Sequence, residues 1–159
     1  MDKLRISQRT LPHWELDNAT YFVTFNTWEK LPLTPAAQQV VLDACLFFSD
    51  QRYKLWTAVV MPDHVHMLLR PLPKENSEKV WTLSSIMHSI KSYSAKQVPL
   101  VMNHIGTVWQ PERYDRIIRN AKEFENTFHY IRQNPVKANL VNSYRQYPYL
   151  WECDRLAQS

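Results

Sequence analysis

The order of apolar and polar positions along the chain predicts an alternation of strands and helices. Aromatic and β-branched residues dominate the segment 21–28, which favours a strand, and three further strands are expected later in the chain. In three longer segments apolar residues recur at intervals of three and four, as on a helix with one buried face. The strands are expected at residues 21–28, 53–61, 64–70 and 114–119. The helices are expected at residues 35–50, 78–97 and 121–134.

Residues typical of helix ends define some of these boundaries more closely. Thr34 precedes a proline, which predicts a side-chain cap ahead of the first helix. Asn120 has the same position before the third helix, and Glu123 three residues later completes the pattern of a capping box. Pro135 disfavours helical geometry at Asn134, so the third helix is expected to stop there.

The predicted order, strand–helix–strand–strand–helix–strand–helix, is that of an α+β domain. Its first six elements follow the ferredoxin-like, split βαβ plan, an antiparallel sheet of four strands with two helices on one face. The seventh element is an extra C-terminal helix. A chain of 159 residues can bury one core. One domain is expected over residues 1–159, with an irregular N-terminal arm at 1–20 and a C-terminal tail at 140–159 that is irregular from Tyr144.

Composition argues against several classes of protein. Gly106 is the single glycine, so neither a P-loop nor a Rossmann loop fits, and no nucleotide cofactor is expected. Turns must use proline, asparagine and aspartate instead. Cys45 and Cys153 lie far apart without a CxxC motif, which argues against a disulfide framework or a cysteine zinc site. Because no apolar run approaches the length of a membrane span and no signal peptide is visible, we expect a cytoplasmic protein without a membrane segment.

Two histidines, His64 and His66, lie inside the apolar run of the third strand. Side chains two residues apart on a strand point to the same face, so both imidazoles should leave one side of the sheet together. Val65 and Met67 should point to the other side. The pair could hold one metal ion, but buried strands also carry histidines that simply bind backbone carbonyl groups. A third ligand elsewhere in the chain decides between these interpretations.

The third predicted helix offers such a ligand and a nucleophile. Phe124, Phe128 and Ile131 share the stripe expected to face the core, and Tyr130 and Asn134 lie four residues apart on a neighbouring stripe. A tyrosine can form a covalent intermediate, but a phenol with an ordinary pKa of about 10 needs help. A divalent cation helps chiefly by polarising the scissile phosphate. Two imidazoles and one amide oxygen suit Mg²⁺ or Mn²⁺.

Simpler interpretations stay open for these residues. Tyr130 could be a half-buried helix tyrosine, and Asn134 could cap a short helix at 135–139. Tyr93 on the second helix is a rival nucleophile. The remaining histidines fit surface, partly buried or loop positions better than ligand positions: His88, His104 and His129.

Two segments resemble motifs of a known family. Residues 61–68, MPDHVHML, resemble the HUH motif of single-strand-specific tyrosine nucleases in the form carried by IS200-like transposases. Residues 129–138, HYIRQNPVKA, resemble the tyrosine segment of one subgroup, the REP-associated tyrosine transposases. The segments 21–25, 109–111 and 115–119 also fit the pattern, so the resemblance covers nearly the whole chain in order. One departure is Asn139, where many relatives have glycine. Asparagine is the next best residue for a left-handed helix cap, so the turn can survive.

The resemblance implies an HUH fold and a divalent metal, Mg²⁺ or Mn²⁺, held by His64, His66 and Asn134. It implies that Tyr130 attacks a DNA phosphate to give a 5′-phosphotyrosine link and a free 3′-hydroxyl. Because the link preserves the phosphodiester energy, the strand can be rejoined. Family substrates are single-stranded DNA beside hairpins, often repetitive extragenic palindromes. IS200-like relatives are dimers with shared active sites and the REP-associated type can act as monomers, so both monomer and homodimer stay open.

Basic residues accumulate late in the chain, and the net charge of +4 is compatible with nucleic-acid binding. A hairpin substrate requires phosphate contacts and stacking of unpaired bases. The candidate DNA contacts, on or near the elements that carry the motifs, are Lys91, Arg116, Arg119, Arg132 and Lys137. In the arm, Lys3, Arg5 and Arg9 could read the bases that flank the hairpin.

Three other functions compete with DNA cleavage. A non-catalytic hairpin-binding regulator of the same fold would not need the intact set of His64, His66, Tyr130 and Asn134. A replication or plasmid-relaxation initiator of the wider HUH class usually has extra domains, for which 159 residues leave little room. A structural RNA-binding βαββαβ domain should carry exposed aromatic residues on two central strands, where this chain has histidines.

Overall fold

The computed structural model describes residues 19–154, and so the arm residues Lys3, Arg5 and Arg9 lie outside the described part. The strands are β1 (Thr20–Asn26), β2 (Tyr53–Val60), β3 (His64–Pro71), β4 (Tyr114–Ile118) and β5 (Leu150–Glu152). The α-helices are α2 (Pro35–Phe47), α3 (Leu83–Val101) and α4 (Ala121–Lys137). Two short 3₁₀ helices are η2 (Trp28–Lys30) and η3 (Tyr144–Gln146).

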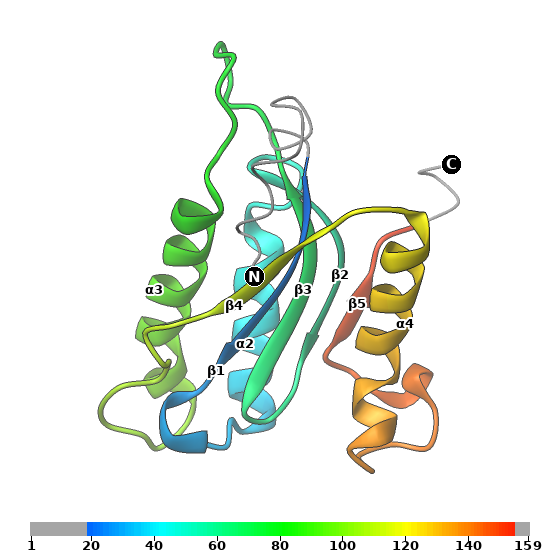
Figure 1. Ribbon diagram of the computed structural model, residues 1–159. Helices are drawn as coiled ribbons and strands as arrows, with labels where there is room; N and C mark the ends of the chain where they lie inside the picture. Colours follow the sequence, from blue (N-terminus) through cyan, green and yellow to red (C-terminus); the bar gives the residue numbers. More distant parts are fainter. Residues whose placement is uncertain (1–18, 155–159) are drawn as a thin grey trace.

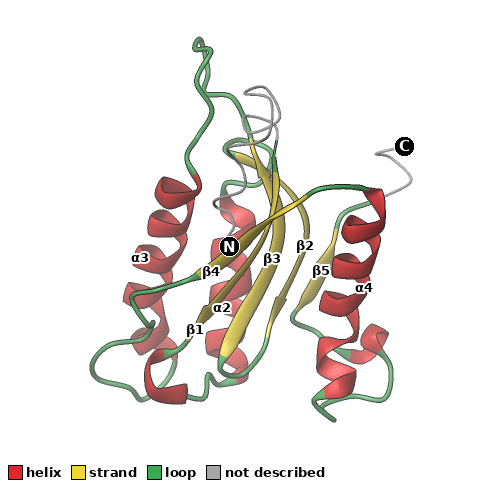
Figure 2. Ribbon diagram, in the orientation of Figure 1, coloured by secondary structure: helices red, strands yellow, loops and turns green. Residues whose placement is uncertain are grey.

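The strands form one antiparallel sheet in the order β4-β1-β3-β2-β5 (Figure 2). The split βαβ arrangement is confirmed for the first four strands, which makes the domain α+β. The sheet has a fifth strand, however, and the expectation of an irregular tail is wrong at residues 150–152. β5 is only three residues long and pairs with β2 through Thr57↔Glu152 and Val59↔Leu150. A segment this short has no readable period, so the strand is defined by its distant partner.

The two faces of the sheet are covered by different helices (Figure 1). Helices α2 and α3 pack on one face over a core that includes Phe25, Val65 and Met67. Helix α4 packs on the other face, where Phe128 and Ile131 meet Leu68. The stripe predicted for the third helix is therefore buried, and this helix adds a third layer to the fold.

A bulge in β2 lets this strand serve both cores. The pairing register with β3 shifts between Leu55 and Thr57. As a result, Leu55 and Ala58 belong to the core under α2 and α3, although they are three residues apart. Val59 and the partly buried Trp56 belong to the core under α4. The continuous apolar run of this segment concealed the bulge, because both faces are buried.

Three boundaries of the first two helices differ from those expected. The first helix ends at Phe47 and the second begins at Leu83, where the Thr82 hydroxyl accepts a hydrogen bond from the Ser85 N–H at 3.0 Å. Residues 78–82 belong instead to the connection after β3, in which Val80 bridges Pro73. α3 then continues past residue 97 and through Pro99 to Val101. No helix within residues 19–154 is both long and apolar enough to span a membrane.

Helix α4 also passes through a proline, so the expected stop at Asn134 is wrong. Pro135 is buried and lies two residues before the end of the helix, so the cost of its missing N–H is confined to the last turn. That turn closes with Asn139 in the left-handed region at φ 61°. The N–H groups of Asn139 and Leu140 donate to the carbonyl oxygens of Val136 and Pro135, the two bonds of a Schellman motif.

The N-terminal cap of α4 is confirmed, although its capping box is not. The Asn120 side chain accepts a hydrogen bond from the Glu123 N–H at 2.9 Å. The Glu123 carboxylate accepts from the N–H of Arg119 rather than from that of Asn120. The cap of α2 is as expected, with the Thr34 hydroxyl accepting from the Ala37 N–H at 3.2 Å.

Candidate functional site

Strand β3 places two imidazoles on the sheet face that α4 covers. The rings of His64 and His66 lie 4.8 Å apart at an angle of 71°. Val65 and Met67 are buried in the opposite core, as the strand period requires. From α4, Asn134 reaches this face, and its Oδ1 lies 3.2 Å from Nε2 of His64. The two imidazoles and the amide oxygen, 70 residues apart in sequence, therefore share one site.

Each histidine is held by a second residue through its other ring nitrogen. Nδ1 of His64 lies 2.8 Å from the carboxylate of Asp63, and Nδ1 of His66 lies 2.8 Å from the hydroxyl of Thr24. Thr24 is the residue of β1 that pairs with His66 in the sheet. Both partners fix ring orientation and leave Nε2 available, the arrangement typical of metal-ligating histidines. Sequence reasoning missed both residues. The position of Asp63 next to His64 in sequence could have suggested their contact. The contact of Thr24 with His66 could be predicted only from the register of β1 on β3.

The contact between His64 and Asn134 favours a positive charge between them. A carboxylate only accepts hydrogen bonds, so Nδ1 of His64 carries a proton on its contact with Asp63. Nε2 of a neutral ring then presents a lone pair to Oδ1 of Asn134, which is also an acceptor. Two facing lone pairs at 3.2 Å repel each other unless a cation or a ring proton lies between them, or the amide turns its NH2 group towards the ring. The donor set therefore fits a bound cation.

His66 is the more deeply buried of the pair, with 5% of its surface exposed. Burial and the neighbouring His64 lower its pKa to about 3. The ring is therefore neutral at physiological pH, as a metal ligand must be. Within residues 19–154 no group of three or more histidines, cysteines or acidic residues could form a metal site. A site here depends on Asn134 as third donor, and mixed imidazole and amide ligands suit Mn²⁺ or Mg²⁺.

Tyr130 lies one helical turn before Asn134 on the same side of α4. Its ring centroid is 5.5 Å from that of His66 and 6.0 Å from that of Phe22 on β1. The side chain is 44% exposed, so an incoming molecule can reach the phenol. The rival Tyr93 is also exposed, but it lies on α3, on the opposite side of the sheet from the histidines. The structure therefore brings Tyr130, and not Tyr93, to the histidines.

A cationic side chain lies beside the site on β4. The guanidinium of Arg116 lies 5.3 Å from the centre of the Phe22 ring and donates to the hydroxyl of Thr127 on α4 at 3.2 Å. A small cavity of about 140 Å³ adjoins Phe22 and is lined by Phe22, Thr24, Tyr114, Asp115 and Arg116. Arg116, one of the five candidate DNA contacts, thus lies beside Phe22, whose ring is 6.0 Å from that of Tyr130.

The other candidate DNA contacts have different surroundings. Lys91 lies on α3, away from the α4 face, and donates to the carbonyl oxygens of Gln110 and Pro111. Arg132 forms two hydrogen bonds with the Glu152 carboxylate, at 2.7 and 2.8 Å, which fasten α4 to β5. Arg119 and Lys137 are exposed near opposite ends of α4. DNA binding by these four residues stays a prediction.

The turn between β2 and β3 is held rigidly, and this positions His64. The carbonyl of Asp63 accepts from both the N–H and the hydroxyl of Thr27, at 3.0 and 3.2 Å. The carbonyl of Val60 accepts from the amide of Gln38 and the hydroxyl of Tyr147, at 3.0 and 2.6 Å. These donors come from the segment after β1, from α2 and from the chain beyond α4. Sequence reasoning found none of them, because no local pattern marks such long-range contacts.

Comparison with known proteins adds independent information. The family model described as "Transposase IS200 like" matches residues 37–134, which include both histidines, Tyr130 and Asn134. An Escherichia coli protein named REP-associated tyrosine transposase is 28% identical over 136 residues, 84% of this chain and 76% of that protein. A Haemophilus influenzae protein provisionally given the same name is 25% identical over 99 residues, 57% of this chain. The matched segment spans about half, 53%, of that protein.

Solved structures show the same fold. A REP-associated tyrosine transposase bound to a REP hairpin superposes with a TM-score of 0.67 at 25% identity, covering 84% of this chain and 76% of that one. A second structure, from Deinococcus radiodurans, superposes with a TM-score of 0.51 at 19% identity, covering 70% of this chain and 88% of that one. At that identity, the second similarity concerns the fold alone.

Proposed function

Because this chain belongs to the IS200-like transposase family, we propose that it cleaves and rejoins single-stranded DNA beside hairpins, with Tyr130 as the nucleophile. One observation carries the proposal. Tyr130, His64, His66 and Asn134 meet on one face of the sheet, with the Tyr130 ring 5.5 Å from His66 and Asn134 Oδ1 3.2 Å from His64. A helix tyrosine with a purely structural role has no need of this constellation.

The proposed step exchanges one phosphodiester for another. The phenol oxygen of Tyr130 forms a bond to phosphorus, and its proton passes to the solvent that reaches the half-exposed ring. The bond between phosphorus and the 3′-oxygen of the preceding nucleotide breaks, and that oxygen takes up a proton. The products are a 5′-phosphotyrosine link and a free 3′-hydroxyl. Since no high-energy cofactor is consumed, the same atoms can react in reverse and join strands.

The chain's own residues supply ligands and orientation for a divalent cation, Mg²⁺ or Mn²⁺. His64, His66 and Asn134 would hold it, and Asp63 and Thr24 fix the two rings through Nδ1. When bound, the cation polarises the scissile phosphate and offsets the charge that develops on it. Arg116 lies beside Phe22 with its guanidinium facing the same surface, which suits a neighbouring DNA phosphate.

The proposed partner is a single-stranded DNA that carries a hairpin. The relative whose structure contains a REP hairpin covers 84% of this chain, which supports a hairpin here as well. Tyr114 is 62% exposed on β4 next to Arg116, and an exposed aromatic ring can stack with an unpaired base. A basic side chain and an aromatic ring side by side are typical of surfaces that track a single strand.

The test is covalent capture on a denaturing gel. The protein is incubated with hairpin oligonucleotides from the palindromic repeats of its own genome, labelled at the 3′ end that the 5′-phosphotyrosine link retains, with Mn²⁺ or Mg²⁺. We expect a slow protein–DNA band that disappears with a chelator and in Tyr130→Phe. Tyr93→Phe is the matched control, because it removes the rival exposed phenol, and it should keep the band.

Two outcomes would contradict the proposal. A band that survives in Tyr130→Phe would assign the nucleophile to another residue, with Tyr93 the next candidate. Tight hairpin binding without any band, with both metals present, would favour a non-catalytic regulator that uses the same surface.

A further inference from the structure

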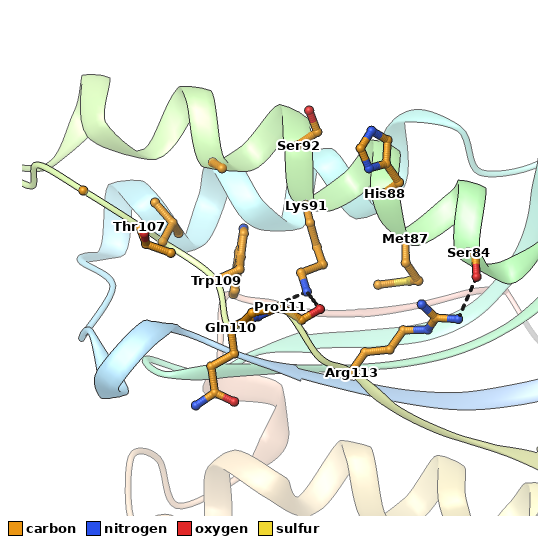
Figure 3. Close-up of a pocket in the computed structure, with 13 residues that line it drawn as sticks. Ser84, Met87, His88, Lys91, Ser92, Thr107, Trp109, Gln110, Pro111 and Arg113 are labelled. Atoms are coloured by element: carbon orange, nitrogen blue, oxygen red, sulfur yellow. Dashed lines mark hydrogen bonds between the residues drawn. The ribbon is translucent and has the colours of Figure 1, made fainter.

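A second cavity, of about 460 Å³, lies between α3 and the segment 106–113 that leads into β4 (Figure 3). Its volume is within the range of small-molecule sites. Its walls come from the helix that faces away from α4, so it is separate from the site around Tyr130. Nothing in the proposed cleavage step uses it.

Two cationic side chains reach this cavity from opposite walls. The Lys91 ammonium extends from α3 towards the carbonyl oxygens of Gln110 and Pro111, at 2.7 and 3.3 Å (Figure 3). Arg113 donates through Nε to Asp115 and through Nη2 to Ser84 on α3. An ammonium has three donors and a guanidinium five, so each cation keeps donors for a ligand.

The two cations also repel each other. Burial and the nearby Arg113 lower the pKa of Lys91, and Glu112 opposes them only in part. Asp115 faces Arg113, and no carboxylate lies among the residues that line the cavity itself. An anion bound between Lys91 and Arg113 would relieve this repulsion, which makes the cavity suited to a phosphate group.

The remaining walls suit a flat apolar group. Met87, Val108 and Trp109 are buried and form part of the lining. The Trp109 ring is held in place because its Nε1–H donates to Ser94 and the ring meets that of Phe25 at an angle of 65°, with centroids 4.9 Å apart. A rigid apolar wall beside a pair of cations matches the two parts of a nucleotide. The wall suits the base, and the cations suit the phosphate.

The position of the cavity relates it to the cleavage site. Arg113 comes directly before β4, which is the edge strand of the sheet. Three residues further along β4, at about 10 Å for an extended chain, Arg116 lies beside Phe22 and the Tyr130 site. The exposed Tyr114 lies between them. A DNA strand could therefore pass from Tyr130 over the edge of β4 into the cavity.

We infer that the cavity between α3 and residues 106–113 binds one unpaired nucleotide of the DNA strand, with its phosphate between Lys91 and Arg113 and its base against the Trp109 wall. The inference rests on the proposed function, because it takes the ligand to be the strand that Tyr130 cleaves. It gives Lys91 a phosphate-binding role at a distance from the catalytic residues.

The test measures DNA affinity in the Tyr130→Phe background, where no cleavage occurs. One oligonucleotide is a hairpin with single-stranded tails on both sides, and the other is the same hairpin without tails. Lys91→Met and Arg113→Gln should each weaken binding of the tailed hairpin about tenfold and leave the tailless one unchanged. For the tailed hairpin, the plot of log affinity against log salt concentration should become shallower by about 0.7. This is the change expected when one phosphate contact to a single strand is lost.

Matched controls separate charge from structure. Lys96→Met removes the same charge from an exposed position on α3 that does not line the cavity, and should change neither affinity. Thr107→Glu adds a negative charge at the exposed rim without removing a side-chain contact, and should weaken only the tailed hairpin. This variant keeps the test valid if Lys91→Met, which leaves two carbonyl groups unpaired, unfolds the segment.

Equal affinities for the wild-type and variant proteins, or equal losses for both oligonucleotides, would overturn the inference. Its failure is distinguishable from that of the proposed function. A covalent band from the Tyr130 protein without any tail-dependent effect of Thr107→Glu would reject the cavity alone. A tail-dependent effect without any covalent band would reject the cleavage step and keep the cavity as a DNA site.

Discussion

At the scale of single residues, His66 links the site to the stability of the fold. Its pKa falls to about 3 through burial and the neighbouring His64, whereas a histidine in the unfolded chain titrates at about 6.5. Below pH 6.5 the unfolded state therefore binds a proton that the folded state does not. The free energy of unfolding should fall as the pH drops from about 6.5 towards 3, by up to about 1.4 kcal/mol per pH unit.

Chemical denaturation of the metal-free protein at pH 7.5, 5.5 and 4.5 checks this expectation. The wild-type protein should lose stability over this series, and His66→Gln, which cannot be protonated, should lose less. An equal loss in both proteins would show that other groups cause the acid sensitivity.

The residues of the site differ in how far the sequence could reveal them. The shared face of His64 and His66 follows from the strand period, and the pairing of Tyr130 with Asn134 follows from the helix period. Thr24 reaches His66 only because β1 pairs with β3 in one particular register. The pairing of Arg132 with Glu152 could not be foreseen, because local patterns did not predict strand β5.

At the scale of elements, the C-terminal end of α4 depends on a non-glycine residue in a left-handed conformation. Asn139 has φ 61° and closes the turn that follows Asn134 and Pro135. Alanine at this position should reduce the free energy of unfolding by about 1 kcal/mol, because it keeps a strained Cβ but lacks the short polar side chain that makes asparagine tolerant of this conformation. Glycine should leave it unchanged or raise it.

Thermal or denaturant unfolding of Asn139→Ala and Asn139→Gly distinguishes the two effects. The order of stability should be glycine, then asparagine, then alanine. If alanine were as stable as asparagine, the left-handed turn would not be what ends the helix.

The boundaries of elements were less predictable than their existence. Pro135 and Pro99 both lie inside helices, where a local rule predicts an end. The local cost was outweighed at Pro135 by burial of the ring and by the bonds of the closing turn. Likewise β5 has too few residues for a pattern, and its place is set by hydrogen bonds to β2, including that from the Thr57 hydroxyl to the Trp151 carbonyl.

At the scale of the whole molecule, the sheet separates two surfaces of different character. Helix α4 brings Tyr130 and Asn134 to the histidines of the same chain, so one copy holds the complete set. The fastening of α4 to β5 through Arg132 and Glu152 supports this arrangement. We therefore expect one copy to suffice for the site.

Mixing two inactive variants tests whether the site is assembled within one chain. Tyr130→Phe retains the metal ligands, and His64→Ala retains the nucleophile. Combined in equal amounts with the hairpin and Mn²⁺, they should form no covalent adduct. Wild-type protein at half the total concentration sets the reference amount of adduct. A comparable amount from the mixture would show that Tyr130 of one copy works with the histidines of another.

The most direct test of the cleavage mechanism is to locate the DNA link on the chain. Trypsin cuts after Lys122 and Arg132 and releases residues 123–132, in which Tyr130 is the single tyrosine. Tyr93 is released separately in residues 92–96. After reaction with the hairpin and Mn²⁺, followed by nuclease and trypsin digestion, mass spectrometry should find a 5′-nucleotide remnant on the peptide 123–132. A remnant on another peptide, or none when the hairpin is bound, would contradict the assignment of Tyr130.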